Sequence, residues 1–105
     1  MEFQPQVIEE LVQKIVKAVN PQRIILFGSA ARGEFGSASD IDLLVVMPEG
    51  THRRRTAQKL YRQIQGIEAS FDILVATTGD IQRHKDNIGL IYRTVLKEGK
   101  ELYAR

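Results

Sequence analysis

Two aspartates, Asp40 and Asp42, stand at the start of an otherwise apolar run, Ile41–Met47. In a β-strand, side chains two residues apart point to the same face and lie about 6.5–7 Å apart along the chain, so both carboxylates can reach one site. At an effective dielectric constant near 20 and a separation of about 5 Å, their repulsion costs roughly 3 kcal/mol. A cation can offset this cost, and paired carboxylates that leave room for water and phosphate oxygens typically hold Mg²⁺. The alternative is a turn formed by Ser39 and Asp40, with Asp42 paired to an arginine.

A third carboxylate, Asp72, lies inside a second apolar run, Phe71–Ala76. If the two runs form neighbouring strands, Asp72 can meet the first two carboxylates on one face of a sheet. Three carboxylates around two metal ions form the arrangement that clamps the attacking and leaving oxygens in phosphoryl or nucleotidyl transfer. The alternative for Asp72 is an ion pair with an arginine, for example Arg23 or Arg93.

The loop that precedes the first pair has residues suited to binding phosphate. Gly28 permits a sharp turn and close approach of the backbone, and Ser29 offers a hydroxyl and a peptide N–H. Arg32 adds a guanidinium that can bind phosphate through two hydrogen bonds. Gly28 and Gly33 have the spacing of P-loop glycines, but Glu34 replaces the lysine that should follow. A third glycine for a dinucleotide-binding loop is also missing, so both of these phosphate loops are excluded.

The apolar periodicity predicts the elements that must position these residues. Residues 1–105 are expected to form one α+β domain with two layers, in which a small mixed β-sheet is covered by helices. A helix starting at Pro5 should end before Asn20, and a second should run from a Thr51 cap to about Gln65 with Tyr61 on its inner face. The remaining expected elements are strands at Arg23–Phe27, Ile41–Met47 and Phe71–Ala76, one or two helical pieces between Thr78 and Gly99, and an edge strand at Lys100–Tyr103.

The composition favours a folded protein and excludes several kinds of site. Of the 105 residues, 43% are hydrophobic and 27% are charged, which is close to the average for globular domains. The chain has no cysteine, so disulfides, thiolate metal sites and a cysteine nucleophile are excluded. Because there is neither a basic leader nor an apolar run of about 20 residues, we expect a cytoplasmic protein without a membrane partner.

The net charge of +2 is divided unevenly along the chain. Residues 1–50 carry a net charge of −3 and residues 51–105 carry +5. This division suits an acidic metal site in the first half and a basic surface in the second half that faces phosphates or an acidic partner. Solvated helix faces are the simpler explanation for most of these cations. The run Arg53–Arg55 lacks interleaved aromatic residues, so nucleic acid is not an expected partner. His52 and His84 are expected at the surface.

The pattern of Gly28-Ser29, ten residues, then Asp40-Ile41-Asp42, with Asp72 on a later strand, resembles the nucleotidyltransferase superfamily. That superfamily includes the polymerase-beta-like enzymes and kanamycin nucleotidyltransferase. The short chain, with "IILFGSAARGEFGSASDIDLLVV" near its start and "GLIYRTVLKEGKELYAR" at its end, is most similar to the minimal nucleotidyltransferases, the MNT proteins. The resemblance covers nearly the whole chain and implies the nucleotidyltransferase fold.

The resemblance implies a role for each candidate residue. Asp40 and Asp42 match the aspartates that bind two Mg²⁺ ions, with Mn²⁺ as an alternative, and these ions hold the triphosphate of ATP or another NTP. Asp72 matches the carboxylate that ligates the second ion and helps to activate the acceptor hydroxyl. Gly28 and Ser29 match the residues that cradle the triphosphate. The implied reaction is attack of a hydroxyl on the α-phosphate with release of pyrophosphate.

The resemblance also implies a partner. Many minimal members are antitoxins that bind a HEPN-domain toxin, a helical ribonuclease, and some transfer AMP to a tyrosine of that toxin. A binding module that neutralises a toxin by contact, with weak catalysis, is the alternative function. Tyr61, Tyr92 and Tyr103 fit core or interface positions better than acceptor or base-stacking roles. The apolar segment Ile88–Leu96 fits either the core or the face of a homodimer.

Overall fold

The first helix has its apolar residues on the side that meets the sheet. The computed structural model describes residues 5–28, 31, 41–67, 69–84 and 91–105. Helix α1 spans Pro5–Val19, as predicted, and its inner residues Leu11 and Ile15 are fully buried. Asn20 then turns the chain with a φ of 51°, a conformation that asparagine tolerates better than most residues. None of the described helices has the length and apolar content needed to cross a bilayer.

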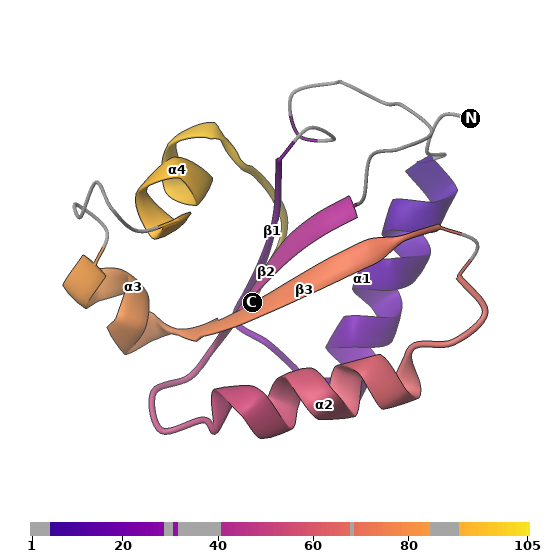
Figure 1. The fold of residues 1–105 in the computed structure, drawn as a ribbon, viewed down its shortest axis with the longest axis horizontal. Helices are drawn as coiled ribbons and strands as arrows, with labels where there is room; N and C mark the ends of the chain where they lie inside the picture. Colours follow the sequence, from indigo (N-terminus) through magenta and orange to yellow (C-terminus); the bar gives the residue numbers. More distant parts are fainter. Residues whose placement is uncertain (1–4, 29–30, 32–40, 68, 85–90) are drawn as a thin grey trace.

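Four strands form one mixed sheet in the order β3-β2-β1-β4 (Figure 1). Their bounds are Arg23–Phe27 for β1, Ile41–Met47 for β2, Phe71–Thr77 for β3 and Lys100–Ala104 for β4. Strand β1 is antiparallel to both β2 and β4, whereas β2 and β3 are parallel. The predicted mixed sheet is therefore confirmed, and β3 and β4 each extend one residue beyond the predicted range.

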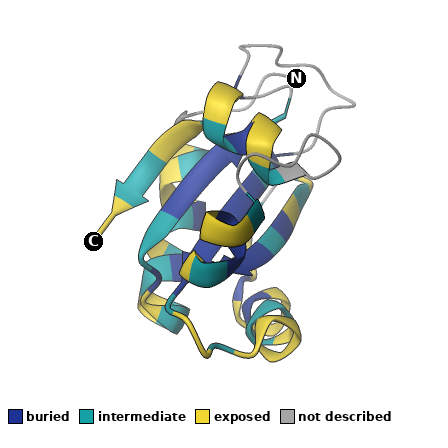
Figure 2. Cartoon of the chain, turned by 90° about the vertical axis from the view of Figure 1, so that its left-hand side faces the viewer, coloured by how far each residue is buried: buried dark blue, intermediate teal, exposed yellow. Residues whose placement is uncertain are grey.

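Hydrophobic side chains pack on both faces of this sheet, and its strands β1 and β2 are largely buried (Figure 2). The larger core lies under α1 and α2, which spans Arg53–Gln63, and includes Leu43, Val45 and Leu60. On the other face, the short helices α3 (Thr78–His84) and α4 (Ile91–Glu98) cover a smaller core that includes Leu44 and Val95. The predicted sheet and helix layers are present, and α3 and α4 form a partial layer on the second face.

Helix α2 begins one residue later than the sequence indicated. The N–H of Thr51 donates to the carbonyl of Pro48 at 3.2 Å, so Thr51 belongs to the turn that follows β2. His52 caps the helix instead, because its Nδ1 accepts the N–H of Arg55 at 3.2 Å. The helix then ends at Gln63 rather than near Gln65, since Ile64 takes an extended conformation with φ −86° and ψ 107°.

The placement of Tyr61 on the inner face of α2 was wrong. Tyr61 is 47% exposed, and its ring stacks on Phe71 with a centroid distance of 5.9 Å. Its hydroxyl accepts the N–H of Ile73 at 2.8 Å. Because β3 is an edge strand, this N–H has no neighbouring strand to bind. Tyr61 therefore lies along the free edge of β3 instead of in the core.

Candidate active site

Asp42 and Asp72 are neighbours across the parallel pair of strands. Each is the second residue of its strand, and the register places Asp42 opposite Asp72. Adjacent strands lie about 4.8 Å apart and opposite residues share a face, so both carboxylates belong to one place on the sheet. Leu44 and Leu74, two residues further along, pack in the core on the α3 and α4 side. Asp42 is partly buried and Asp72 is exposed, so the pair lies at an open end of that face.

Gly28 follows β1 and lies directly beside the carboxylate of Asp42. The preceding residue, Phe27, is opposite Asp42 in the antiparallel pair of β1 and β2. Gly28 has a φ of +75°, in the left-handed region that residues with a Cβ avoid. A Cβ at this position would also overlap the Oδ2 atom of Asp42. Glycine is therefore required here for two reasons, and the loop after β1 starts against the acidic pair.

The donor atoms at this place fit a divalent cation that prefers oxygen ligands. Asp42 and Asp72 provide hard carboxylate oxygens, and the exposure of Asp72 leaves coordination positions for water and phosphate, as Mg²⁺ requires. The missing side chain at Gly28 allows Oδ2 of Asp42 to lie close to the backbone at the start of the segment that follows β1. Among the described residues, no three His, Cys, Asp or Glu side chains gather as a metal site. The described part of the chain thus supplies a pair of candidate ligands for Mg²⁺ or Mn²⁺.

The other predicted site residues, Ser29, Arg32 and Asp40, lie outside the described residues. Their roles stay predictions from the sequence. Gly28 fixes where their loop begins, and Ile41 fixes where it ends because its N–H donates to the carbonyl of Ser70 at 3.0 Å. The segment between them therefore follows β1, whose last residue Phe27 lies opposite Asp42, and it leads into β2, which carries Asp42.

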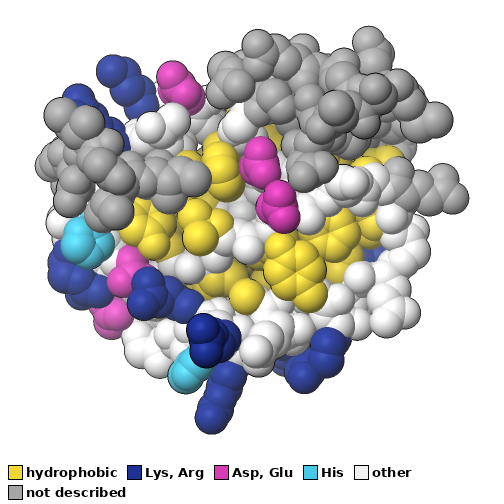
Figure 3. All heavy atoms as spheres, viewed as in Figure 1, with side chains coloured by type: hydrophobic (Ala, Val, Ile, Leu, Met, Phe, Trp, Pro, Cys, Tyr) yellow, Lys and Arg dark blue, Asp and Glu magenta, His cyan; other side chains and the backbone are white. Residues whose placement is uncertain are grey.

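The ion-pair alternative for Asp72 finds no support in the described parts of the chain. Arg23 binds Glu101 instead, with Nε and Oε2 2.6 Å apart. No ion pair joins Asp72 to Arg23 or Arg93 among the residues that the structure describes. In Figure 3, acidic side chains lie together near the centre of the face, beside hydrophobic ones, and basic side chains line its lower margin.

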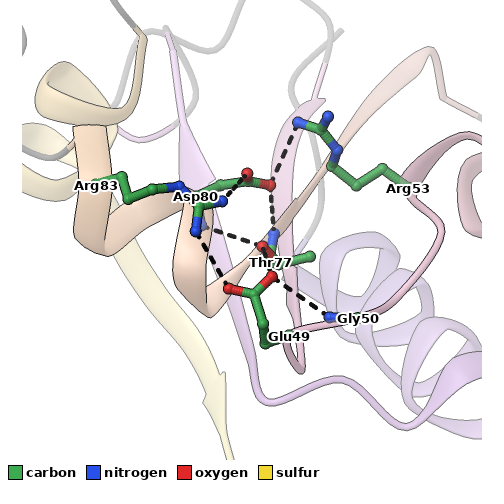
Figure 4. Close-up of polar contacts among 6 residues, drawn as sticks. All are labelled: Glu49, Gly50, Arg53, Thr77, Asp80 and Arg83. Carbon is green, nitrogen blue, oxygen red and sulfur yellow. Dashed lines mark hydrogen bonds and ion pairs between the residues drawn. The ribbon is translucent and has the colours of Figure 1, made fainter.

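A second polar cluster lies at the opposite end of β3. Thr77 caps α3: its hydroxyl accepts the N–H of Asp80 at 3.1 Å, and its own N–H donates to Oδ2 of Asp80 at 3.0 Å. This reciprocal arrangement is a capping box. Arg53 and Arg83 contact the same carboxylate at 3.3 and 3.0 Å (Figure 4). The hydrogen bond from the Thr77 N–H, followed by the other contacts, holds the pKa of Asp80 below its ordinary value against the effect of burial.

The cluster around Asp80 is structural rather than part of the acidic site. Asp72 and Thr77 are five residues apart in β3, which corresponds to about 16 Å. Arg53 begins α2 and Arg83 lies in α3, so the carboxylate ties both helices to the end of the sheet. The signal for this cluster in the sequence is the Thr-x-x-Asp spacing of a capping box.

Comparison with known proteins places this chain in a known family. The model of the nucleotidyltransferase domain family matches residues 6–102, which include Gly28, Asp42 and Asp72. The chain belongs to this family. The resemblance recognised in the glycine and aspartate pattern is thereby confirmed, and the assignment supports a nucleotidyltransferase enzyme.

Individual relatives of this nucleotidyltransferase domain agree with the family assignment. Over 54 residues it is 35% identical to the candidate protein adenylyltransferase MJ0141 of Methanocaldococcus jannaschii, and the match covers 51% of this chain and 54% of that protein. The chain thus spans about half the length of this curated relative.

Solved structures agree with the fold. The crystal structure of a candidate nucleotidyltransferase from Sulfolobus solfataricus has a TM-score of 0.65 at 23% identity, over 95% of this chain and 79% of that one. A toxin–antitoxin structure with AMP-PNP has a TM-score of 0.55 at 25% identity, over 92% of this chain and 73% of that one. The predicted α+β nucleotidyltransferase fold is confirmed by these similarities.

Proposed function

We propose that this domain transfers AMP from ATP to a hydroxyl group of a partner protein, in a reaction that depends on Mg²⁺. The observation that carries the proposal is the register pair of Asp42 and Asp72, which lies against Gly28 at the open end of the sheet. The family assignment supports nucleotidyl transfer. The adenylyltransferase relative supports AMP as the transferred group and a protein as the acceptor.

In the proposed reaction, the acceptor oxygen attacks the α-phosphorus of ATP. A new oxygen–phosphorus bond forms while the acceptor hydroxyl loses its proton to solvent, the bond to the oxygen that bridges the α- and β-phosphates breaks, and pyrophosphate leaves with the electron pair. Mg²⁺, when bound, neutralises phosphate charge and stabilises the attacking and leaving oxygens. Asp42 and Asp72 would hold two Mg²⁺ ions together with Asp40. Asp72 is exposed, so its carboxylate can also accept a hydrogen bond from the acceptor hydroxyl and orient it.

The chain's own residues would position the triphosphate before the reaction. Gly28 lets the backbone pass beside Asp42 without a side chain, so phosphate oxygens can approach the peptide N–H groups that follow. We include Ser29 and Arg32 in this phosphate-binding loop on the sequence motif alone. The pair of carboxylates would repel the triphosphate without a cation, which makes the metal a requirement for binding.

We further propose that the partner is a HEPN-domain toxin and that the domain acts as its antitoxin in the cytoplasm. The support is the sequence resemblance to MNT proteins and the similarity to a chain of a toxin–antitoxin structure with AMP-PNP. In this view the acceptor hydroxyl belongs to the toxin. Transfer of AMP to the toxin, and not contact alone, would neutralise the toxin. A binding module with weak catalysis would instead neutralise it by contact.

In the decisive experiment, the domain is incubated with labelled ATP, Mg²⁺ and a HEPN-domain toxin, and the masses of both proteins are then measured. We expect one AMP on the partner. Asp42→Asn and Asp72→Asn should lower the rate by about 100-fold or more, because several kcal/mol of transition-state stabilisation depend on the cation. Glu10→Gln removes an exposed carboxylate from α1 and should leave the rate unchanged.

Two results would contradict the proposal. Transfer that persists with Asp42→Asn and Asp72→Asn would show that the acidic pair is not the site. Neutralisation of the toxin by Asp42→Asn without any AMP transfer would show that contact alone is the mechanism. Removal of the metal with EDTA should lower the rate of transfer at least as much as Asp42→Asn or Asp72→Asn does.

A further inference from the structure

The outer face of α2 carries more positive charge than the helix itself can balance. The helix, Arg53–Gln63, contains five cations and no acidic residue. Arg53 binds Asp80, but no ion pair or hydrogen bond from the side chains of Arg54, Arg55, Lys59 or Arg62 occurs among the described residues. Cations in the first turn oppose the helix dipole, and like charges three or four residues apart repel. This arrangement lowers the stability of the isolated helix, so we look for its role in binding to another molecule.

An aromatic side chain stands in the same exposed stripe. Arg54, Gln58, Tyr61 and Arg62 are exposed and follow one another at spacings of four, three and one residues, which places them on one side of the helix. Tyr61 is 47% exposed. Tyrosine and arginine are the residues most enriched among those that dominate protein–protein binding energy. Figure 3 shows basic side chains along the lower margin of the molecule, where α2 runs in Figure 1.

Tyr61 is held in place before any partner arrives. Its ring is nearly parallel to that of Phe71, with an interplanar angle of 8°, and its hydroxyl accepts the N–H of Ile73 at 2.8 Å. The hydroxyl keeps its own proton for donation to a partner. A side chain that is already ordered loses little further entropy on binding. The ring is therefore a pre-organised contact point.

This stripe also adjoins the acidic site. Phe71 and Ile73, which contact Tyr61, flank Asp72 in β3, and β3 is the edge of the sheet. A partner protein that covers Tyr61 would also lie along the free edge of β3, the strand that carries the exposed carboxylate of Asp72. Because Asp72 points to the α3 and α4 face whereas Phe71 and Ile73 point to the α2 face, a partner that covers both the outer face of α2 and the acidic site must reach around the free edge of β3.

We propose that the stripe Arg54, Gln58, Tyr61 and Arg62 is the docking surface for an acidic face of the acceptor protein. This inference rests on the proposed function and adds the chemistry of the acceptor. The uncompensated arginines select an acidic surface, and the fixed Tyr61 gives it an anchor next to Asp72. Nucleic acid fits less well, because one face of the Tyr61 ring is already covered by Phe71 and Asp42 and Asp72 would repel a phosphate backbone beside it.

The test measures binding without ATP, so that it is independent of catalysis. The probes are a glutamate–tyrosine copolymer, a lysine–tyrosine copolymer of equal length and single-stranded oligoadenylate. Fluorescence anisotropy measures the affinity of the domain for each probe at about 0.15 M salt. We expect the acidic copolymer to bind most tightly. Arg54→Glu/Arg62→Glu should weaken that binding at least tenfold and reverse the preference toward the basic copolymer, which an unfolded variant cannot do. Lys17→Glu/Lys100→Glu makes the same charge change at exposed positions on α1 and β4 and should leave the preference unchanged.

Three other outcomes would overturn all or part of the docking surface. Equal binding of the acidic copolymer by the wild type and by Arg54→Glu/Arg62→Glu would show that the stripe is not used. Tighter binding of oligoadenylate, lost in the same variant, would assign the stripe to nucleic acid. The ring is tested in the same way: Tyr61→Ala should reduce the affinity more than Tyr61→Phe, which loses only the hydroxyl, and equal affinities of the wild type and Tyr61→Ala would remove Tyr61 from the surface. If the wild type binds the acidic copolymer as expected but transfers no AMP to the toxin in the presence of ATP and Mg²⁺, the proposed function is refuted and the docking surface is not.

Discussion

Replacement of Gly28 by alanine should damage nucleotide binding more than it damages the fold. The φ of +75° at Gly28 costs a residue with a Cβ about 1–2 kcal/mol. The added methyl group would also overlap Oδ2 of Asp42, so this carboxylate must rotate or the start of the loop must shift. We therefore expect a moderate loss of stability together with a displaced metal ligand.

The size of the effect on binding follows from linkage. Mg²⁺ and AMP-PNP at about 100 times their dissociation constant should raise the free energy of unfolding by about 2.7 kcal/mol. If the displaced carboxylate weakens binding 100-fold, the same ligand concentration is about equal to the new dissociation constant. The increment then falls to about 0.4 kcal/mol.

Urea denaturation with and without Mg²⁺ and AMP-PNP measures both terms separately. Gly66→Ala is the matched control, because Gly66 also has a positive φ of +80° but its Cβ would meet nothing within 4 Å. Without ligand, both variants should lose about 1–2 kcal/mol from the positive φ, and Gly28→Ala should lose somewhat more because of the overlap with Asp42. Only Gly28→Ala should lose the increment from ligand. Equal increments in the two variants would refute the view that Gly28 makes room for the site.

Three further substitutions test the structure around the site. Asp80→Asn should lower the free energy of unfolding most at pH values above the ordinary pKa of aspartate, because the lowered pKa of Asp80 stabilises the fold only while the carboxylate is ionised. The deficit should shrink as the pH falls from the ordinary pKa through the lowered one, and a deficit that does not change with pH in urea denaturation would contradict this. Tyr61→Phe should lower the free energy of unfolding by about 1 kcal/mol and speed amide hydrogen exchange at Ile73. Unchanged exchange would show that the hydrogen bond from the Ile73 N–H to the Tyr61 hydroxyl does not protect this amide. Leu44→Ala, at a fully buried position, should cost about 2–5 kcal/mol, and a loss below 1 kcal/mol in the same assay would show that the smaller core contributes little.

The sequence was sufficient for the strands and for the main helix, because apolar runs and apolar periodicity report burial directly. Ile41–Met47 was predicted with its observed bounds, and α1 begins at Pro5 as expected. The meeting of Asp42 with Asp72 could be stated only conditionally, since it depends on the parallel register of β2 and β3. Register is set by packing across the whole sheet and not by the residues of one strand.

Two predictions were wrong, the cap of α2 and the position of Tyr61, and in both cases a contact with another segment overrides the usual preference of the residue. His52 caps α2 although threonine is the commoner cap, because the turn from Pro48 already engages Thr51. Tyr61 has the helical spacing of a core residue, but the free N–H of Ile73 at the sheet edge draws its hydroxyl outward. Such outcomes depend on contacts between distant segments, which periodicity does not report.

The side chains along β3 also bear on how the protein behaves at high concentration. Tyr61 binds the outward N–H of Ile73, and Asp80 binds that of Thr77, so side chains occupy places where a strand from another molecule would pair. Exposed edge strands promote aggregation when their backbone groups are available. We infer that these two residues limit strand-to-strand association between copies, and that a partner docked on Tyr61 would shield the edge without opening it.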